Sequence, residues 1–154
     1  MLMDEIQYEV VTEAPVEAVV DLYRAGGWWQ ESDHAREVIP RMIRGSFCFM
    51  VARSRGQIVA MGRVISDGAS DAYLQDIVVL EAFRGRGIGR ELIRRLTAFC
   101  MSRGIGWIGL VAEPGTTKLY ADLGYEPLRG YQAMLHGKEA RHVEDVPGSR
   151  AQAR

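Results

Sequence analysis

Apolar and polar positions repeat along this chain with two different periods, which predicts both strands and helices. Near-alternating or continuously apolar short runs predict strands over residues 6–12, 47–53, 57–66, 72–80, 107–112 and 131–136. Apolar positions at helical spacing predict helices over residues 15–24, 33–42, 88–104 and 117–123. Pro15 at the start of the first helix and Gly26 and Gly27 after its end are typical helix boundaries.

The order of these segments predicts a mixed sheet of the α/β class. A strand, a long helix and a second strand over residues 72–112 form a βαβ unit, so we expect its two strands to be parallel and adjacent. The turn at residues 54–56 joins two earlier strands into a hairpin, which makes the rest of the sheet mostly antiparallel. We expect a single domain over residues 1–136, with helices flanking the sheet, and a polar, flexible tail over residues 137–154.

A glycine-rich turn, Arg84-Gly85-Arg86-Gly87-Ile88-Gly89-Arg90, lies between the strand at 72–80 and the following helix. Glycine lets the backbone approach a ligand closely, and a helix N-terminus supplies unpaired N–H donors and partial positive charge. Such a turn is suited to a phosphate or pyrophosphate. A dinucleotide fingerprint needs a different glycine spacing and a P-loop needs Gly-Lys-Ser/Thr, so neither fits. A solvated glycine–arginine turn or a nucleic-acid patch remains the alternative.

Two motifs in this order resemble those of the GNAT superfamily of acetyl-CoA-dependent N-acetyltransferases. The first runs from Tyr73 to Gly89, where Arg84, Gly87 and Gly89 stand at the defining positions of Arg/Gln-x-x-Gly-x-Gly/Ala. The second is Leu119-Tyr120-Ala121-Asp122-Leu123-Gly124-Tyr125, a tyrosine on a short helix followed by Leu-Gly-Tyr. The resemblance covers about residues 6–136 and implies a GNAT-type sheet whose central parallel strands splay apart.

The resemblance also implies which residues hold acetyl-CoA, with coenzyme A as the product. The pantetheine arm is expected between the splayed strands, paired with free backbone groups of Ile77, Val78 and Val79. The remaining expected contacts come from the glycine-rich turn and from the second motif. These residues are Arg84, Gly85, Arg86, Gly87, Ile88, Gly89, Arg90, Lys118 and Tyr120.

For catalysis we expect direct attack of an amine on the thioester, with Tyr120 donating a hydrogen bond to the leaving thiolate. The general base is less defined. Related polyamine-type enzymes carry Tyr-Leu-Glu-Asp where this chain has Tyr73-Leu74-Gln75-Asp76, and Gln75 cannot take a proton. Asp76 is the candidate base, expected on the opposite side of the strand from Gln75, with a chain of ordered waters as the alternative. Seven residues before Tyr120, many members of that superfamily have an asparagine, whereas this chain has Glu113.

The acceptor site is expected around the segment that follows the first helix. Two adjacent tryptophans, Trp28 and Trp29, cannot both face one core, so one of them is a candidate wall of a pocket. Glu31 is a candidate partner for a cationic amine, and Gln75 is a further candidate contact. A loop held by one buried tryptophan, with solvated acids, is the alternative. We expect a small-molecule primary amine as acceptor, ahead of a protein N-terminus or lysine.

Composition narrows the remaining possibilities. The 154-residue chain has a formal net charge of −1, which gives no general attraction to nucleic acid or to an anionic membrane. No apolar run approaches the length of a membrane span, and the first residues lack a signal-peptide pattern, so a cytoplasmic protein is expected. Cys48 and Cys100 fit buried thiols. No metal ligand is assigned, a homodimer stays open, and the alternative of another class is a non-catalytic acyl-CoA-binding module.

Overall fold

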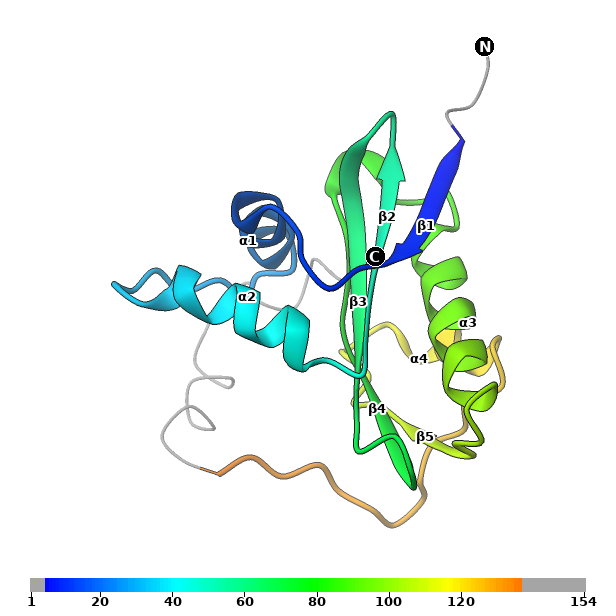
Figure 1. Cartoon of the computed structure of the whole chain (residues 1–154). Helices are drawn as coiled ribbons and strands as arrows, with labels where there is room; N and C mark the ends of the chain where they lie inside the picture. The colour runs from blue at the N-terminus through cyan, green and yellow to red at the C-terminus, as the bar shows by residue number, and fades with distance from the viewer. Residues whose placement is uncertain (1–4, 137–154) are drawn as a thin grey trace. The chain divides into compact units, whose positions relative to one another are not determined.

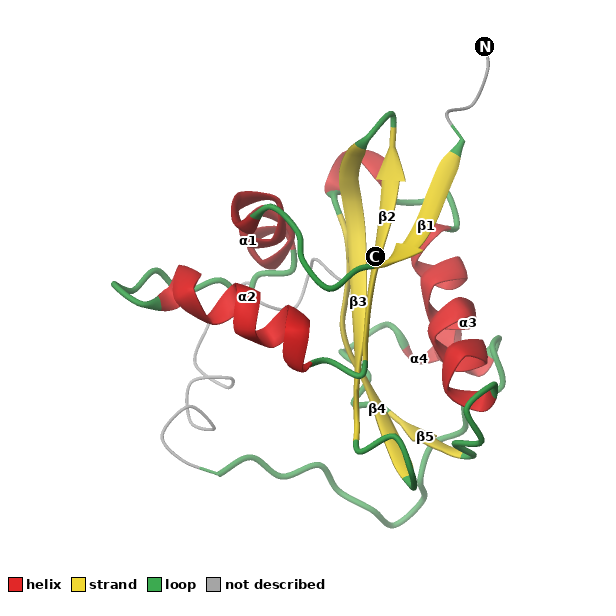
Figure 2. Ribbon diagram, viewed as in Figure 1, coloured by secondary structure: helices red, strands yellow, loops and turns green. Residues whose placement is uncertain are grey.

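The computed structural model describes residues 5–136. Its contacts divide the chain into two compact units, residues 1–110 and residues 111–154. The first unit holds a five-stranded sheet in the order β1-β2-β3-β4-β5, with α1 and α2 on one face and α3 on the other (Figure 2). This arrangement confirms the mixed α/β fold that the sequence predicts. No helix among the described residues is long and apolar enough to span a membrane.

The elements follow one another along the chain as Figure 1 shows. Their bounds are β1 Ile6–Val10, α1 Val16–Ala25, α2 Ala35–Gly45, β2 Cys48–Ser54, β3 Gln57–Ser66, β4 Asp71–Val79, the 3₁₀ turn η1 Glu81–Phe83, α3 Ile88–Met101 and β5 Trp107–Gly109. In the second unit the described residues form α4, Thr117–Ala121.

The sheet is antiparallel except at its last pair. Strands β1 to β4 pair antiparallel with their neighbours, and β4 pairs parallel with β5. The parallel pair joins residues 71–73 to residues 107–109, with α3 as the crossover. The βαβ prediction is therefore confirmed, because a parallel pair requires such a crossover connection.

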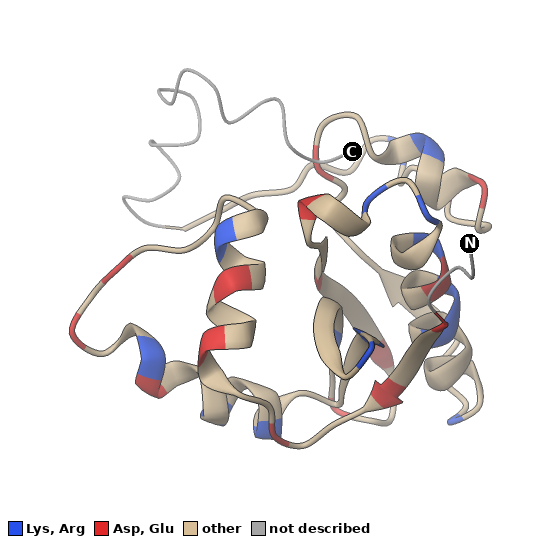
Figure 3. Ribbon diagram, turned by 90° about the horizontal axis from the view of Figure 1, so that it is seen from above, with Lys and Arg blue, Asp and Glu red and all other residues tan. Residues whose placement is uncertain are grey.

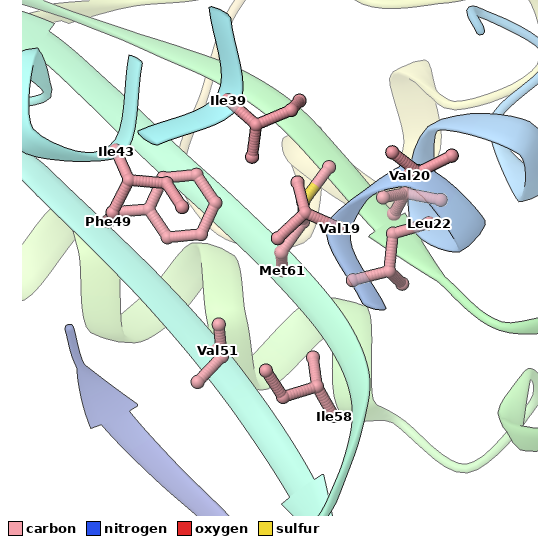
Figure 4. Close-up of a cluster of buried hydrophobic side chains, with 10 residues drawn as sticks. Val19, Val20, Leu22, Ile39, Ile43, Phe49, Val51, Ile58 and Met61 are labelled. Atoms are coloured by element: carbon pink, nitrogen blue, oxygen red, sulfur yellow. The ribbon is translucent and has the colours of Figure 1, made fainter. Parts of the chain in front are cut away.

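The core lies on both faces of the sheet. Between the sheet and the α1–α2 layer, one cluster buries aliphatic side chains around Phe49 and Met61, which are at most 1% exposed (Figure 4). On the other face, α3 contributes an apolar stripe, Ile88, Leu92, Ile93, Leu96 and Cys100. Burial of each such side chain is worth about 1.5–3 kcal/mol relative to exposure. The two layers therefore hold β3 and β4 in a fixed register.

Several predicted bounds differ from the structure, among them the end of α3 at Met101 instead of residue 104. Helix α2 continues to Gly45, past the predicted end and through Pro40. The lost backbone hydrogen bond is tolerated because Ile39 and Ile43 are buried on one face. Strand β5 ends at Gly109, three residues early. The strand predicted over residues 131–136 is wrong: alternation favours a strand, but among the described residues this segment joins no sheet, and Tyr131 is 80% exposed.

Candidate functional site

The glycine-rich turn starts α3 in a conformation that only glycine adopts without strain. Gly85 and Gly87 have φ values of 74° and 77°, in the left-handed region. Gly87 is the N-cap of α3, and no side chain caps this helix end. The backbone N–H groups of the first turn have no intrahelical acceptor and lie at the positive end of the helix dipole. Figure 3 shows basic residues in the turn that leads into α3.

Gly89 brings this helix end close to the end of β4. A Cβ atom built on Gly89 would lie 3.6 Å from Cγ2 of Val79, an ordinary packing distance. The first turn of α3 therefore lies directly against the last residue of β4. A ligand group bound at the helix start would lie next to this strand end.

Strand β4 loses its β5 neighbour along the second half of its length. The β4–β5 pairing ends at Tyr73 opposite Gly109, whereas β4 continues to Val79 on its β3 side. Ile77, Val78 and Val79 thus lie in the stretch where β5 no longer pairs with β4. The predicted backbone site for an extended ligand lies at this fork between the strands, the edge of β4 beyond residue 73.

Arg84 does not present its side chain to the helix start. Its Nε donates a hydrogen bond to the carbonyl oxygen of Val79 at 3.0 Å, and its Nη2 donates to the carbonyl oxygen of Ala25 at 2.9 Å. Both bonds are partly buried. The carbonyl of Val79 is therefore already bonded, so the expectation of wholly free backbone groups fails at this atom. Arg86 instead stacks its guanidinium over the ring of Phe83, 5.1 Å from the centroid.

Asp76 lies at an irregularity in β4. Its φ is +56°, and the register between β3 and β4 shifts between Met61 and Arg63, so that β4 carries an extra residue there. Arg63 donates from Nε to Asp76 Oδ2 at 2.6 Å and from Nη2 to Gln75 Oε1 at 3.2 Å. The side chains of Gln75 and Asp76 therefore reach the same guanidinium. The prediction that they point to opposite sides of β4 is wrong, because the bulge interrupts the alternation.

The Asp76 carboxylate also anchors α1 to the sheet. The hydroxyl of Tyr23, on α1, donates to Asp76 Oδ2 at 2.7 Å, and Met42 Sδ lies 2.8 Å from the same hydroxyl oxygen. Burial, then the adjacent Asp76 charge, holds the pKa of Tyr23 well above its usual range. One carboxylate oxygen thus accepts two hydrogen bonds, and the ion pair with Arg63 is mostly buried. These contacts support the β4 bulge.

The segment after α1 separates its two tryptophans, as expected. Trp28 is 37% exposed and lies across Gly26, where a Cβ would meet its ring at 2.6 Å. Trp29 packs against the core cluster, and its indole N–H donates to Glu31 Oε2 at 3.0 Å. Glu31 also pairs with Arg36, and these bonds, that from Trp29 first, lower the pKa of Glu31. Glu31 is thus already neutralised by a neighbour on α2.

In the second unit, Tyr120 packs against Tyr125. The rings meet edge to face, with centroids 5.9 Å apart. Burial, with smaller contributions from Tyr125 and Glu113, raises the pKa of Tyr120 to about 12. This hydroxyl therefore keeps its proton at neutral pH. Lys118, on the same helix, is exposed and pairs with Asp122 at 3.0 Å.

Two further features were not singled out from the sequence. Arg63 holds both Gln75 and Asp76, and its only signal was a charge inside an otherwise apolar strand. Tyr73 and Trp107 form an aromatic pair, 5.3 Å between centroids, 46% and 43% exposed. The ring of Trp107 lies over Gly109, where a Cβ would meet it at 2.7 Å. This pair stands where β4 and β5 part.

Comparison with known proteins gives one family. The sequence model described as "Acetyltransferase (GNAT) family" matches residues 12–125. The chain is 38% identical over 72 residues to serotonin N-acetyltransferase 2, chloroplastic, of Oryza sativa subsp. japonica, a match that spans 47% of this chain and 36% of that protein. It is 34% identical over 70 residues to histone acetyltransferase TAP1 of Glycine max, spanning 46% and 30%. The chain thus covers about a third of the length of these curated relatives.

Solved structures agree on the fold. A probable acetyltransferase of Staphylococcus aureus superposes with a TM-score of 0.73 at 21% identity, covering 88% of this chain and 99% of that one.

Proposed function

Because this chain belongs to the GNAT acetyltransferase family, we propose that it transfers an acetyl group from acetyl-CoA to a primary amine. The observation that carries the proposal is the start of α3, where Gly87 is left-handed and Gly89 packs against Val79 at the open fork of β4. This geometry fits a pyrophosphate joined to an extended, amide-containing arm. The family uses acetyl-CoA as its co-substrate, and the residues of this chain suit that ligand.

The binding contacts follow from this placement. The first-turn amides of α3 would hold the pyrophosphate, because they are oriented donors at the positive end of a helix. Arg86 and Arg90 would add positive charge around the phosphates. Along the fork, the backbone of Ile77 to Val79 would pair with the pantetheine amides, apart from the Val79 carbonyl that Arg84 occupies.

The proposed reaction is direct attack in a ternary complex. The amine nitrogen forms a bond to the thioester carbonyl carbon, the C–S bond breaks, and the thiolate leaves with the electron pair. Tyr120 remains protonated at neutral pH, so its hydroxyl can donate a hydrogen bond to the developing thiolate. The amine proton passes to ordered water in this proposal, because Asp76 Oδ2 is already bonded to Arg63 and Tyr23. Asp76 then acts by holding the β4 bulge.

A small-molecule amine is the proposed acceptor, and its proposed chemistry is aromatic. The half-exposed Tyr73–Trp107 pair lies at the point where the fork begins, and such rings favour an aromatic or apolar body through stacking. The name of the rice relative, serotonin N-acetyltransferase, supports this class, whereas the name of the soybean relative supports a protein lysine as the second candidate.

The test is acetyl-CoA-dependent thiol release with a panel of amines. We expect arylethylamines to exceed aliphatic diamines of similar length in kcat/KM, with histone-tail and N-terminal peptides as the comparison for the second candidate. Coenzyme A binding without thiol release for any amine would instead identify a non-catalytic acyl-CoA-binding module. Failure to bind coenzyme A at all, measured by calorimetry, would refute the proposed function. Salt-dependent binding to RNA or DNA in its place would favour the nucleic-acid alternative.

A further inference from the structure

Arg84 opens the glycine-rich turn, yet its guanidinium is bonded to two backbone carbonyls from other elements. We propose that Arg84 is a positioning residue that fastens the C-terminal end of α1 to the end of β4. It would thereby couple the acceptor segment that follows α1 to the turn that holds the cofactor. The acceptor and cofactor roles of these segments rest on the proposed function, whereas the fastening itself rests on the contacts alone.

The bonding geometry requires an arginine. Two different nitrogens of one planar group donate to two carbonyl oxygens, Nε to Val79 at 3.0 Å and Nη2 to Ala25 at 2.9 Å. A lysine offers a single ammonium group on a flexible stem and lacks the rigid, planar set of donors that the guanidinium has. Ala25 is the last residue of α1, where a cation also interacts favourably with the helix dipole.

The α1 end of this connection controls where the next segment leaves the helix. Three successive backbone amides donate hydrogen bonds to carbonyl oxygens of the last turn of α1. The Gly26 N–H donates to Leu22 at 2.9 Å, the Gly27 N–H to Arg24 at 3.0 Å and the Trp28 N–H to Tyr23 at 3.0 Å. The Ala25 carbonyl lies within this turn, so fixing it fixes the departure of residues 26–31. That segment carries Trp28, Trp29 and Glu31.

The other end of the connection controls the glycine-rich turn. Val79 ends β4 and lies against Gly89, at the start of α3. The Arg84 backbone is extended and its N–H bonds the Glu81 carbonyl at 3.1 Å, so the residue forms part of the turn while its side chain reaches back. One side chain therefore sets the turn relative to both β4 and α1.

The alternative role is a phosphate ligand, and the two roles respond differently to lysine. A phosphate ligand needs chiefly the charge, which Arg84→Lys retains. A fastening residue needs both hydrogen bonds of the rigid guanidinium group, and Arg84→Lys and Arg84→Ala both lose that pair of bonds. Arg86→Ala is the matched control, because Arg86 stands two residues along the same turn and its guanidinium lies over Phe83.

The first experiment uses hydrogen exchange of the full chain without ligand. We expect the amides of residues 26–28 to exchange about tenfold faster in Arg84→Lys and in Arg84→Ala, since a charge-assisted bond is lost in each. Arg86→Ala should leave them near the wild-type rate. Val64→Ala, a buried β3 variant, controls for a general loss of stability. Unchanged exchange at 26–28 in both Arg84 variants, or wild-type exchange in Arg84→Lys alone, would overturn the proposal.

The second experiment uses coenzyme A calorimetry at low and physiological salt, with steady-state kinetics. We expect both Arg84 variants to lose affinity equally with a wild-type salt dependence, and KM for the amine to rise together with KM for acetyl-CoA. Arg86→Ala should flatten the salt dependence. Retained affinity in Arg84→Lys, with a flatter salt dependence in Arg84→Ala, would assign Arg84 to a phosphate and overturn the proposal. If the wild type binds no coenzyme A, the proposed function fails and exchange alone decides the role of Arg84.

Discussion

Alanine at Gly87 and alanine at Gly89 should change stability in opposite directions, although the two sites are only two residues apart. Gly89 lies inside α3, where a Cβ would be 3.6 Å from Val79 Cγ2, an ordinary contact. Replacing a helical glycine with alanine stabilises the folded state by about 0.5–1 kcal/mol. At Gly87 a Cβ meets nothing within 4 Å, but φ is +77°. The left-handed conformation costs a non-glycine residue about 1–2 kcal/mol.

The assay is reversible thermal or urea unfolding of the ligand-free chain. For a chain of this length, 1 kcal/mol shifts Tm by about 2–4 °C. Gly89→Ala should therefore raise Tm by about 1–4 °C, and Gly87→Ala should lower it by about 2–8 °C. A fall in Tm for Gly89→Ala, or shifts of the same sign in both variants, would show that the local backbone does not behave as described.

A larger side chain at Gly89 separates ligand contact from folding. Neither Gly87 nor Gly89 has a protein neighbour closer than 3.6 Å to a built Cβ, so a folded Gly89→Val chain is sterically possible. We expect Gly87→Val and Gly89→Val to lose coenzyme A binding in calorimetry because their bulk enters the space of the pyrophosphate. Gly89→Ala should retain it, since the family motif accepts alanine there. Wild-type affinity in both valine variants would remove the turn from the binding site.

Three further outcomes are expected. Tyr120→Phe should lower kcat by on the order of a hundredfold with little change in acetyl-CoA binding, whereas Tyr125→Phe should stay near wild type; equal turnover in the two would exclude Tyr120 from the chemistry. Tyr23→Phe should lower the free energy of unfolding by about 1.5–3 kcal/mol, because the Asp76 carboxylate loses a donor, with Tyr8→Phe, whose partly exposed ring lies under Arg95, as the control in urea titrations. Hydrogen bonds from Arg94, then Arg95, lower the pKa of Glu91 from 4.5 to about 2, so its stabilisation is complete above pH 4.5 and is lost as pH falls toward 2. The stability difference between the wild type and Glu91→Gln should shrink over that interval, and a difference independent of pH would contradict this assignment.

The sequence predicts most of the fold because hydrophobic periodicity and turn residues act locally. The stripe of α3 and the hairpin of β2 and β3 follow from such patterns, and the βαβ rule then sets the parallel pair. The glycine-rich turn can be predicted equally well, because its backbone conformation requires glycine at fixed positions. Side-chain contacts between distant segments cannot be predicted in this way. Arg84 bonds a carbonyl 59 residues away, and no local pattern indicates this.

The bulge at Asp76 shows a second limit of the sequence. Strand alternation places Gln75 and Asp76 on opposite faces, and one left-handed residue cancels that rule. The strand expected over residues 131–136 fails for a related reason. Alternation reports which face would be buried, but a strand forms only where another strand accepts its hydrogen bonds.

Position 76 also bears on how this protein can evolve. Its left-handed backbone favours glycine, asparagine or aspartate, while Arg63 and Tyr23 both donate to a carboxylate there. Glycine would relax the backbone and leave two donors without an acceptor, and glutamate would keep the charge on a less suitable backbone. Few single substitutions satisfy both demands, so drift at this position requires a compensating change at Arg63 or Tyr23. A saturation library should therefore show a narrow set of tolerated residues at 76 beside a broad one at Gln75, and second-site recoveries should fall on α1 and β3.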